Sequence, residues 1–125
     1  MDNTVRVRYL VPDVSASIAF YTANLGFTVE LDYAPAFGAV RLGNLLLLLS
    51  GDQSSAARPM PDGRQPEPGG WNRIQLIVDD IGAEAARLRA AGVPFRNEVI
   101  HGPGGAQTVL DDPSGNPVEL FQPAG

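Results

Sequence analysis

The hydrophobic pattern changes its period early in the chain. Residues 5–11 alternate apolar and polar side chains, which predicts a half-buried strand. Beyond Asp13, a favourable N-cap, apolar residues recur at helical spacing, and Gly26 stands where a glycine commonly ends a helix. The apolar positions of this predicted helix are Val14, Ile18, Tyr21 and Leu25. The pattern therefore predicts a strand, a helix and a turn.

The same order of elements returns later in the chain. Residues 73–78 are again strand-like, Asp80 is a second N-cap, and residues 81–91 form an alanine-rich predicted helix closed by Gly92. The two N-caps, Asp13 and Asp80, lie 67 residues apart. The sequence thus contains an internal repeat of one strand-helix unit.

The later strands of the two halves also correspond. The stretch "GNLLLLL" at 43–49 aligns with "GNPVELF" at 115–121 at an offset of 72. We therefore predict an α+β fold of two tandem β-α-β-β-β modules, which form a curled mixed sheet with a cleft on the face that the helices leave free. Within a single domain, 1–125, the predicted parts are module one at 4–50, a linker at 51–70 and module two at 71–123.

The predicted linker is rich in proline, glycine, serine and charged residues, and it cannot supply core. We interpret it as a flexible connection. A lid over the cleft is the alternative, because long loops inside compact domains are often functional.

Composition and charge narrow the possible partners. The 125 residues are 44% hydrophobic and 18% charged, which is ordinary for a globular protein, and the net charge of -5 gives no basic surface for nucleic acid. The chain has no cysteine, so disulfides and thiolate metal sites are excluded. The longest apolar run, Leu45 to Leu49, is too short for a membrane span, and the start of the chain lacks a signal peptide pattern. We expect a cytoplasmic protein.

One carboxylate stands out near the end of the chain. The stretch "DPSGNPVELF" predicts a tight turn and then a strand that carries Glu119 among apolar neighbours. A buried carboxylate is unfavourable unless a partner balances its charge. The partner would be a metal ion, a basic side chain or water.

The stretches "YLVPDVSASIAFYTANLGF", "IVDDIGAEAARLRAAGV" and "DPSGNPVELF" together resemble the vicinal oxygen chelate superfamily, which includes glyoxalase I, extradiol dioxygenases and bleomycin-resistance proteins. The resemblance covers the chain apart from the linker, and the closing motif is its most specific part. It implies paired β-α-β-β-β modules around a cleft, usually in a homodimer. In enzymes of this family a divalent metal is held there by His or Glu side chains from four strands.

The resemblance places those four ligand positions on Arg6, Leu47, Arg73 and Glu119. Only Glu119 is able to bind a metal, because leucine has no lone pair and a guanidinium remains protonated. One carboxylate does not make a divalent-ion site. We therefore predict no metal and no other cofactor, and we expect arginine to balance Glu119.

Strand alternation indicates which side chains share the cleft. The candidate ligand-binding residues are Arg6, Arg8, Phe37, Leu47, Trp71, Arg73, Gln75, Glu119 and Phe121. The surplus of arginine over carboxylate favours a planar, acidic or hydrogen-bond-accepting aromatic ligand.

Several candidates also have a simpler interpretation. Arg6 and Arg8 are equally compatible with the solvated face of an edge strand, and Trp71 with a plug at the end of the core. His101, the only histidine, lies in "VIHGPGG", a predicted turn, where a bystander is more common than a general base. No catalytic residue is predicted.

The sequence thus favours a metal-independent protein that binds a small molecule. By resemblance to the drug-resistance members of the family, we expect it to sequester an aromatic natural product or antibiotic. The alternative is a lyase, isomerase or dioxygenase-type enzyme of the same fold that uses Glu119 with or without a metal. A protein-interaction module is a weaker third possibility. We expect a homodimer and no nucleic acid or membrane partner.

Overall fold

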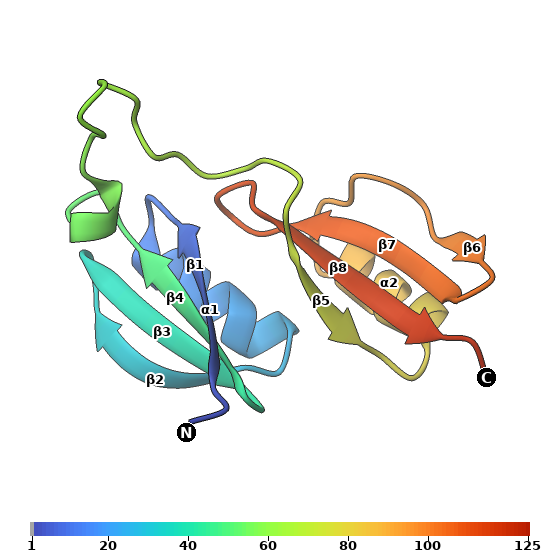
Figure 1. Ribbon diagram of the computed structural model, residues 1–125. Helices are drawn as coiled ribbons and strands as arrows, with labels where there is room; N and C mark the ends of the chain where they lie inside the picture. Colours follow the sequence, from blue (N-terminus) through green and yellow to red (C-terminus); the bar gives the residue numbers. More distant parts are fainter. Residues whose placement is uncertain (1) are drawn as a thin grey trace. The chain divides into compact units, whose positions relative to one another are not determined.

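A computed structural model describes residues 2–125, and the chain divides into two compact units between Gly69 and Gly70. In the first unit, strand β1 (Val5–Leu10) leads into helix α1 (Val14–Asn24), followed by β2 (Thr28–Tyr33), β3 (Phe37–Leu42) and β4 (Leu45–Ser50). The four strands form one mixed sheet in the order β1-β4-β3-β2, with β1 and β4 parallel. Figure 1 shows α1 across one face of this sheet.

The second unit repeats this order. It contains β5 (Ile74–Ile77), helix α2 (Ile81–Ala90), β6 (Ile100–Gly102), β7 (Gly105–Asp111) and β8 (Pro117–Pro123), and its sheet has the order β5-β8-β7-β6. The parallel pair β5 and β8 matches the parallel pair β1 and β4 of the first unit (Figure 1). The predicted α+β repeat of strand, helix and further strands is confirmed, with a separate four-stranded mixed sheet in each unit.

Both helices begin at the predicted aspartates. The Asp13 side chain accepts a hydrogen bond from the Ala16 N–H at 3.0 Å, and the Asp80 side chain accepts one from the Ala83 N–H at 3.0 Å. Gly26 and Gly92 follow the helices with φ of 76° and 86°, a conformation that glycine adopts without a steric penalty.

The core of each unit lies between its helix and its sheet. In the first unit Tyr21 is fully buried and packs edge-on against Phe20 and Phe27, with ring centroids 5.2 and 5.4 Å apart. In the second unit Leu88 is fully buried, as are several residues of the strands. The opposite face of each sheet, which we call its open face, is therefore available for other roles.

Residues 51–70 connect the last strand of the first sheet to β5. They contain a short 3₁₀ helix, Ser55–Ala57, and a turn in which the Met60 N–H donates to the Arg64 carbonyl at 2.8 Å. Among the described residues, neither helix has the length and hydropathy that a bilayer span requires.

Candidate functional site

The open face of the second sheet carries one polar pair and one apolar pair along β5 and β8. Gln75 pairs with Glu119 in the parallel ladder, so their side chains share one face, and Ile77 pairs in the same way with Phe121. Ile74 and Leu76, which alternate with them, are buried. The predicted faces of β5 and β8 agree with this arrangement.

The Glu119 carboxylate is held by two side chains, that of Gln75 on β5 and that of Arg73 directly before this strand. Its Oε1 accepts from Arg73 Nε at 2.9 Å and lies 2.8 Å from Arg73 Nη2, and its Oε2 accepts from Gln75 Nε2 at 2.7 Å. The Glu119 side chain is 7% exposed and that of Arg73 is 28% exposed. The carboxylate therefore has an arginine and an amide as its partners, and each of its oxygens is already engaged.

A second arginine, Arg96, was not predicted from the sequence, and it contacts the segment directly before β5. Arg96 Nε donates to Asp111 Oδ1 at 2.7 Å, and its guanidinium carbon lies 4.6 Å from the centroid of the Trp71 ring. Trp71 is 69% exposed, so it does not plug the core of this unit. A lone arginine between a helix and a strand carries no recognisable pattern, because its partners come from other elements.

Phe121 borders a small hollow on the same open face. The hollow measures about 140 Å³ and is lined by Ile100, Gly102, Gly104, Gly105, Gln107 and Phe121. A side chain at Gly105 would come within 3.0 Å of Phe121 Cζ, so the absence of one leaves room for the ring. The hollow is smaller than the ~300–1,000 Å³ of typical ligand pockets, and it suits one ring of a larger molecule.

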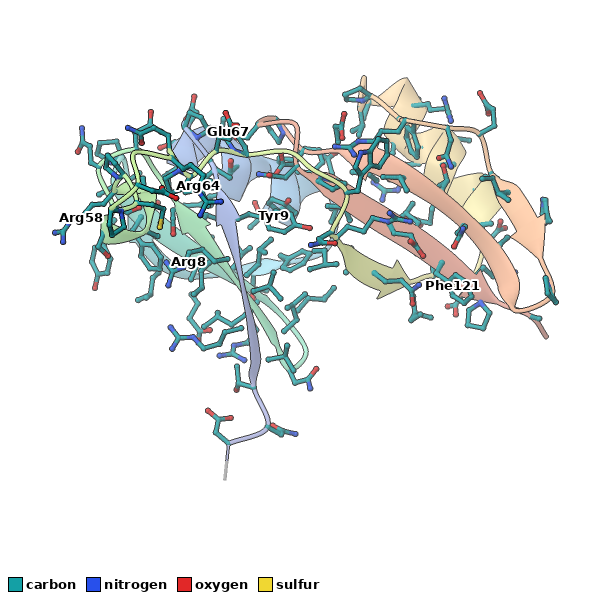
Figure 2. The ribbon with its side chains drawn as sticks, turned by 45° about the horizontal axis from the view of Figure 1, so that its top comes forward. Arg8, Tyr9, Arg58, Arg64, Glu67 and Phe121 are labelled. Atoms are coloured by element: carbon teal, nitrogen blue, oxygen red, sulfur yellow. The ribbon has the colours of Figure 1, made fainter. Side chains whose placement is uncertain are left out.

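The open face of the first sheet carries arginines from β1. Arg8 Nη1 donates to Ser50 Oγ at 2.8 Å, and Phe37 pairs with the same serine across the ladder from β4 to β3. Arg6 lies two residues before Arg8, on the same face, and is exposed. Figure 2 shows Arg8 and Tyr9 on opposite sides of the β1 ribbon, in agreement with the predicted alternation.

Leu47 does not lie on this open face. It pairs with Val7 and Val40 in the ladders, and its neighbour Leu49 pairs with Gly38, whose missing side chain would point at Ile18 of α1. Leu47 therefore faces the helix, and Leu48, which pairs with Arg8, takes the position expected for it. The sequence alignment of the repeats was one residue out here, and the residue type at the position is unchanged.

The side chains present do not fit the divalent metal that the family resemblance implies for enzymes. Two of the four positions are arginines, one is a leucine, and the remaining carboxylate is engaged by Arg73 and Gln75. Within residues 2–125 no group of three or more His, Asp or Glu side chains is placed to hold an ion.

His101 lies outside these clusters. It belongs to the short edge strand β6 and pairs with Ala106, whereas the sequence pattern predicted a turn at this position. The turn consists of Pro103 and Gly104, because Gly102 and Gly105 on either side of it still pair in the ladder. The histidine is exposed and lines a different hollow, of about 280 Å³, near the end of β8.

Comparisons with known proteins agree with this architecture. The family model of the Glyoxalase/Bleomycin resistance protein/Dioxygenase superfamily matches residues 4–120. A solved member of that superfamily from Sphaerobacter thermophilus is 28% identical, with a TM-score of 0.76 and 95% of each chain covered. No curated protein matches the chain.

Two further solved structures differ in what they do. TnmS3, an antibiotic binding protein from Streptomyces sp. CB03234, is 26% identical with a TM-score of 0.73, covering 97% of this chain and 95% of its own. Lactoylglutathione lyase from Agrobacterium tumefaciens is 22% identical with a TM-score of 0.73, covering 94% and 91%. The fold, the repeat and the matched residues together place the chain in the Glyoxalase/Bleomycin resistance protein/Dioxygenase superfamily.

Proposed function

We propose that this protein binds a planar aromatic small molecule, of the natural-product or antibiotic kind, and sequesters it without a metal ion. The observation that carries the proposal is the closed cluster of Arg73, Glu119 and Gln75. Where catalytic relatives would present a metal ligand, this chain presents hydrogen-bonding groups that hold one another.

The cluster is better suited to binding than to acid-base chemistry. A general base must be reachable by the substrate proton, whereas the Glu119 side chain is only 7% exposed and its two oxygens are held by Arg73 and Gln75. A metal ion would have to displace Arg73 from the carboxylate and would be repelled by its charge. An organic ligand needs neither rearrangement.

The charged and apolar groups of the open faces indicate the class of ligand. Arg8 is held by Ser50 in an orientation that leaves guanidinium donors for a ligand, and Arg6 is exposed on the same strand. These groups favour an acidic or hydrogen-bond-accepting ligand. In the second unit Phe121 and the exposed Ile77 offer apolar contact area for a ring.

The antibiotic-binding relative TnmS3, which is 26% identical to this chain, supports small-molecule binding as the role. The lyase relative is the reason to test for catalysis, although its 22% identity is a likeness of fold.

The test is a calorimetric screen of planar aromatic compounds that carry acidic, neutral or cationic groups. We expect binding of acidic members, unchanged by prior dialysis against a chelator, with the ligand recovered unaltered. Arg8→Gln should weaken binding of an acidic ligand about tenfold, and Arg87→Gln, a matched charge change on α2, should leave it unchanged. Recovery of a chemically converted ligand, lost in Glu119→Gln, would support the enzyme alternative instead.

We further propose that the protein assembles as a homodimer, as the family resemblance implies. Light scattering coupled to size-exclusion chromatography should give twice the mass of the chain. A single-chain mass at concentrations where ligand binds would exclude a dimer as a requirement for binding.

A further inference from the structure

Trp71 is the only tryptophan of the chain, and it is 69% exposed at the entrance to β5. Tryptophan is enriched at contact surfaces, because its ring offers a large apolar area together with one polar N–H. A ring of this kind binds a ligand better when its neighbours restrict its orientation.

The ring is backed by an arginine whose guanidinium is held by three hydrogen bonds. Arg96 donates from Nε to Asp111 Oδ1 at 2.7 Å, from Nη1 to the Gly70 carbonyl at 2.7 Å, and from Nη2 to the Gly115 carbonyl at 3.0 Å. Its side chain is 17% exposed, and its guanidinium stands over the ring of Trp71. Hydrogen bonds from all three nitrogens fix the guanidinium plane against one face of the indole.

The backbone that carries the indole is also fixed. Gly69 and Gly70 have φ of 105° and 86°, and the Gly70 carbonyl is bound by Arg96. The Trp71 carbonyl accepts from Arg73 Nη1 at 3.1 Å, and Arg73 is in turn paired with Glu119. The exposed ring is thus attached to the Glu119 cluster through one shared arginine. A ligand that stacks on it meets a group whose conformational entropy is already reduced.

We propose that Trp71, backed by Arg96, is a stacking platform for a planar ring that is electron-rich or anionic. This inference rests on the proposed function and adds the backing of Trp71 by Arg96 and the electronic class of ligand. A cation on one face of a π system draws electron density toward itself and leaves the other face less negative. The free face of the indole therefore accepts an electron-rich ring and disfavours a cationic one, although the ion pair of Arg96 with Asp111 reduces this bias.

The experiment uses the whole protein and three small probes of similar size. Naphthalene-2-sulfonate is planar and anionic, N-methylquinolinium is planar and cationic, and cyclohexanesulfonate is anionic without a π system. Binding is followed by proton-nitrogen NMR, in which Trp71 gives the only tryptophan indole signal. We expect the indole signal to shift with naphthalene-2-sulfonate and to shift much less with the other two probes.

Variants give the second arm of the experiment, with affinity read from backbone amide signals. Trp71→Ala should weaken naphthalene-2-sulfonate about tenfold, and Trp71→Phe should restore most of the loss. Arg96→Gln should narrow the preference for the anionic over the cationic planar probe. Val29→Ala is the control, because Val29 is 52% exposed and lies on the helix-facing side of β2.

The outcomes separate this inference from the proposed function. Binding that persists undiminished in Trp71→Ala overturns the platform and leaves small-molecule binding intact. Equal affinity for the anionic and cationic planar probes overturns the assigned class of ligand. A change of oligomeric mass in Trp71→Ala, with unchanged probe affinity, would assign the ring to self-association. Because Trp71 is exposed, its replacement should not prevent folding, which circular dichroism verifies.

Discussion

At the scale of single residues, Glu119 stands at a position that the family resemblance assigns to a metal ligand, and here hydrogen bonds from neighbouring side chains hold it. Arg73 directs two guanidinium nitrogens at one carboxylate oxygen, and Gln75 occupies the other. Such a buried pair is tolerated because the hydrogen bonds repay much of the desolvation. Its value to stability is measurable.

Glu119→Gln should lower the free energy of unfolding by about 1–3 kcal/mol, because it leaves a mostly buried arginine without its counter-charge. Urea denaturation checks this. The matched control is Glu30→Gln, which removes the partner of Arg41 from a pair whose side chains are 34% and 40% exposed. That change should cost less than ~1 kcal/mol. Equal losses in the two variants would mean that the Glu119 pair contributes no more than a surface pair.

Gly51 supplies a second prediction at this scale. A Cβ atom there would lie 2.5 Å from the Pro35 carbonyl oxygen and 2.9 Å from Val14 Cγ2. Gly51→Ala should therefore destabilise the first unit by about 2 kcal/mol or more, because a backbone oxygen cannot move aside as a side chain can. The control is Gly104→Ala, because nothing lies within 4 Å of a Cβ atom at that position, and it should leave the free energy of unfolding nearly unchanged. Thermal unfolding of both variants measures the two effects.

The sequence predicted some of these residues and missed others for identifiable reasons. The faces of Arg8, Gln75 and Glu119 follow from strand alternation, a local property, and the structure has them as predicted. Arg96 was missed because its hydrogen bonds join three separate segments. Such contacts depend on tertiary pairing, which a single sequence does not encode locally.

At the scale of secondary structure elements, the helices were predicted within a residue or two. The Asp13 and Asp80 N-caps and the glycines after each helix are local signals that do not depend on tertiary structure. Strand register is different, because it is set by pairing with another strand.

The two β-hairpins before the last strands illustrate this. Leu42 pairs with Leu45 across a two-residue turn, whereas Asp111 pairs with Pro117 across a longer one. The glycines of these turns align at an offset of 72, yet the parallel ladders align Leu47 with Val118, because Val7 and Ile74 are their respective partners. Matching the turns therefore shifted the predicted face of Leu47 by one residue.

The N-caps yield a prediction for both helices. Asp13→Ala and Asp80→Ala should each reduce the free energy of unfolding by about 1 kcal/mol, because the N–H groups of Ala16 and Ala83 lose their acceptors. Denaturation followed by circular dichroism measures the loss. Asp79→Ala removes the same charge one residue before the second cap and should have a much smaller effect. A comparable loss at Asp79 would attribute the effect to charge and not to capping.

At the scale of the whole molecule, residues 51–70 decide how the two units are connected. The chain has nine arginines and no lysine, so trypsin cuts it only after arginine. Within this segment the side chain of Arg64 is 82% exposed. Figure 2 shows Arg58 and Arg64 projecting from the segment. Pro59 follows Arg58 and protects that bond from trypsin.

Limited trypsin digestion should therefore cut first after Arg64, since exposed loops are preferred sites of proteolysis. Mass spectrometry should identify fragments 1–64 and 65–125, and Arg64→Gln should remove this early cut. If the segment is a flexible linker, as its composition indicates, a saturating ligand will not change the cleavage rate. Protection by ligand would show that the segment closes over a binding site as a lid.

The place of β8 in the second sheet has a consequence for synthesis. This strand lies between β5 and β7, which have no ladder with each other, although it follows both in the sequence (Figure 1). A nascent chain interrupted before residue 117 would hold two strands that lack their common neighbour, each with an unpaired edge. In the first sheet the corresponding central strand is β4, which is synthesised much earlier. The first sheet can therefore be completed during translation before the second one.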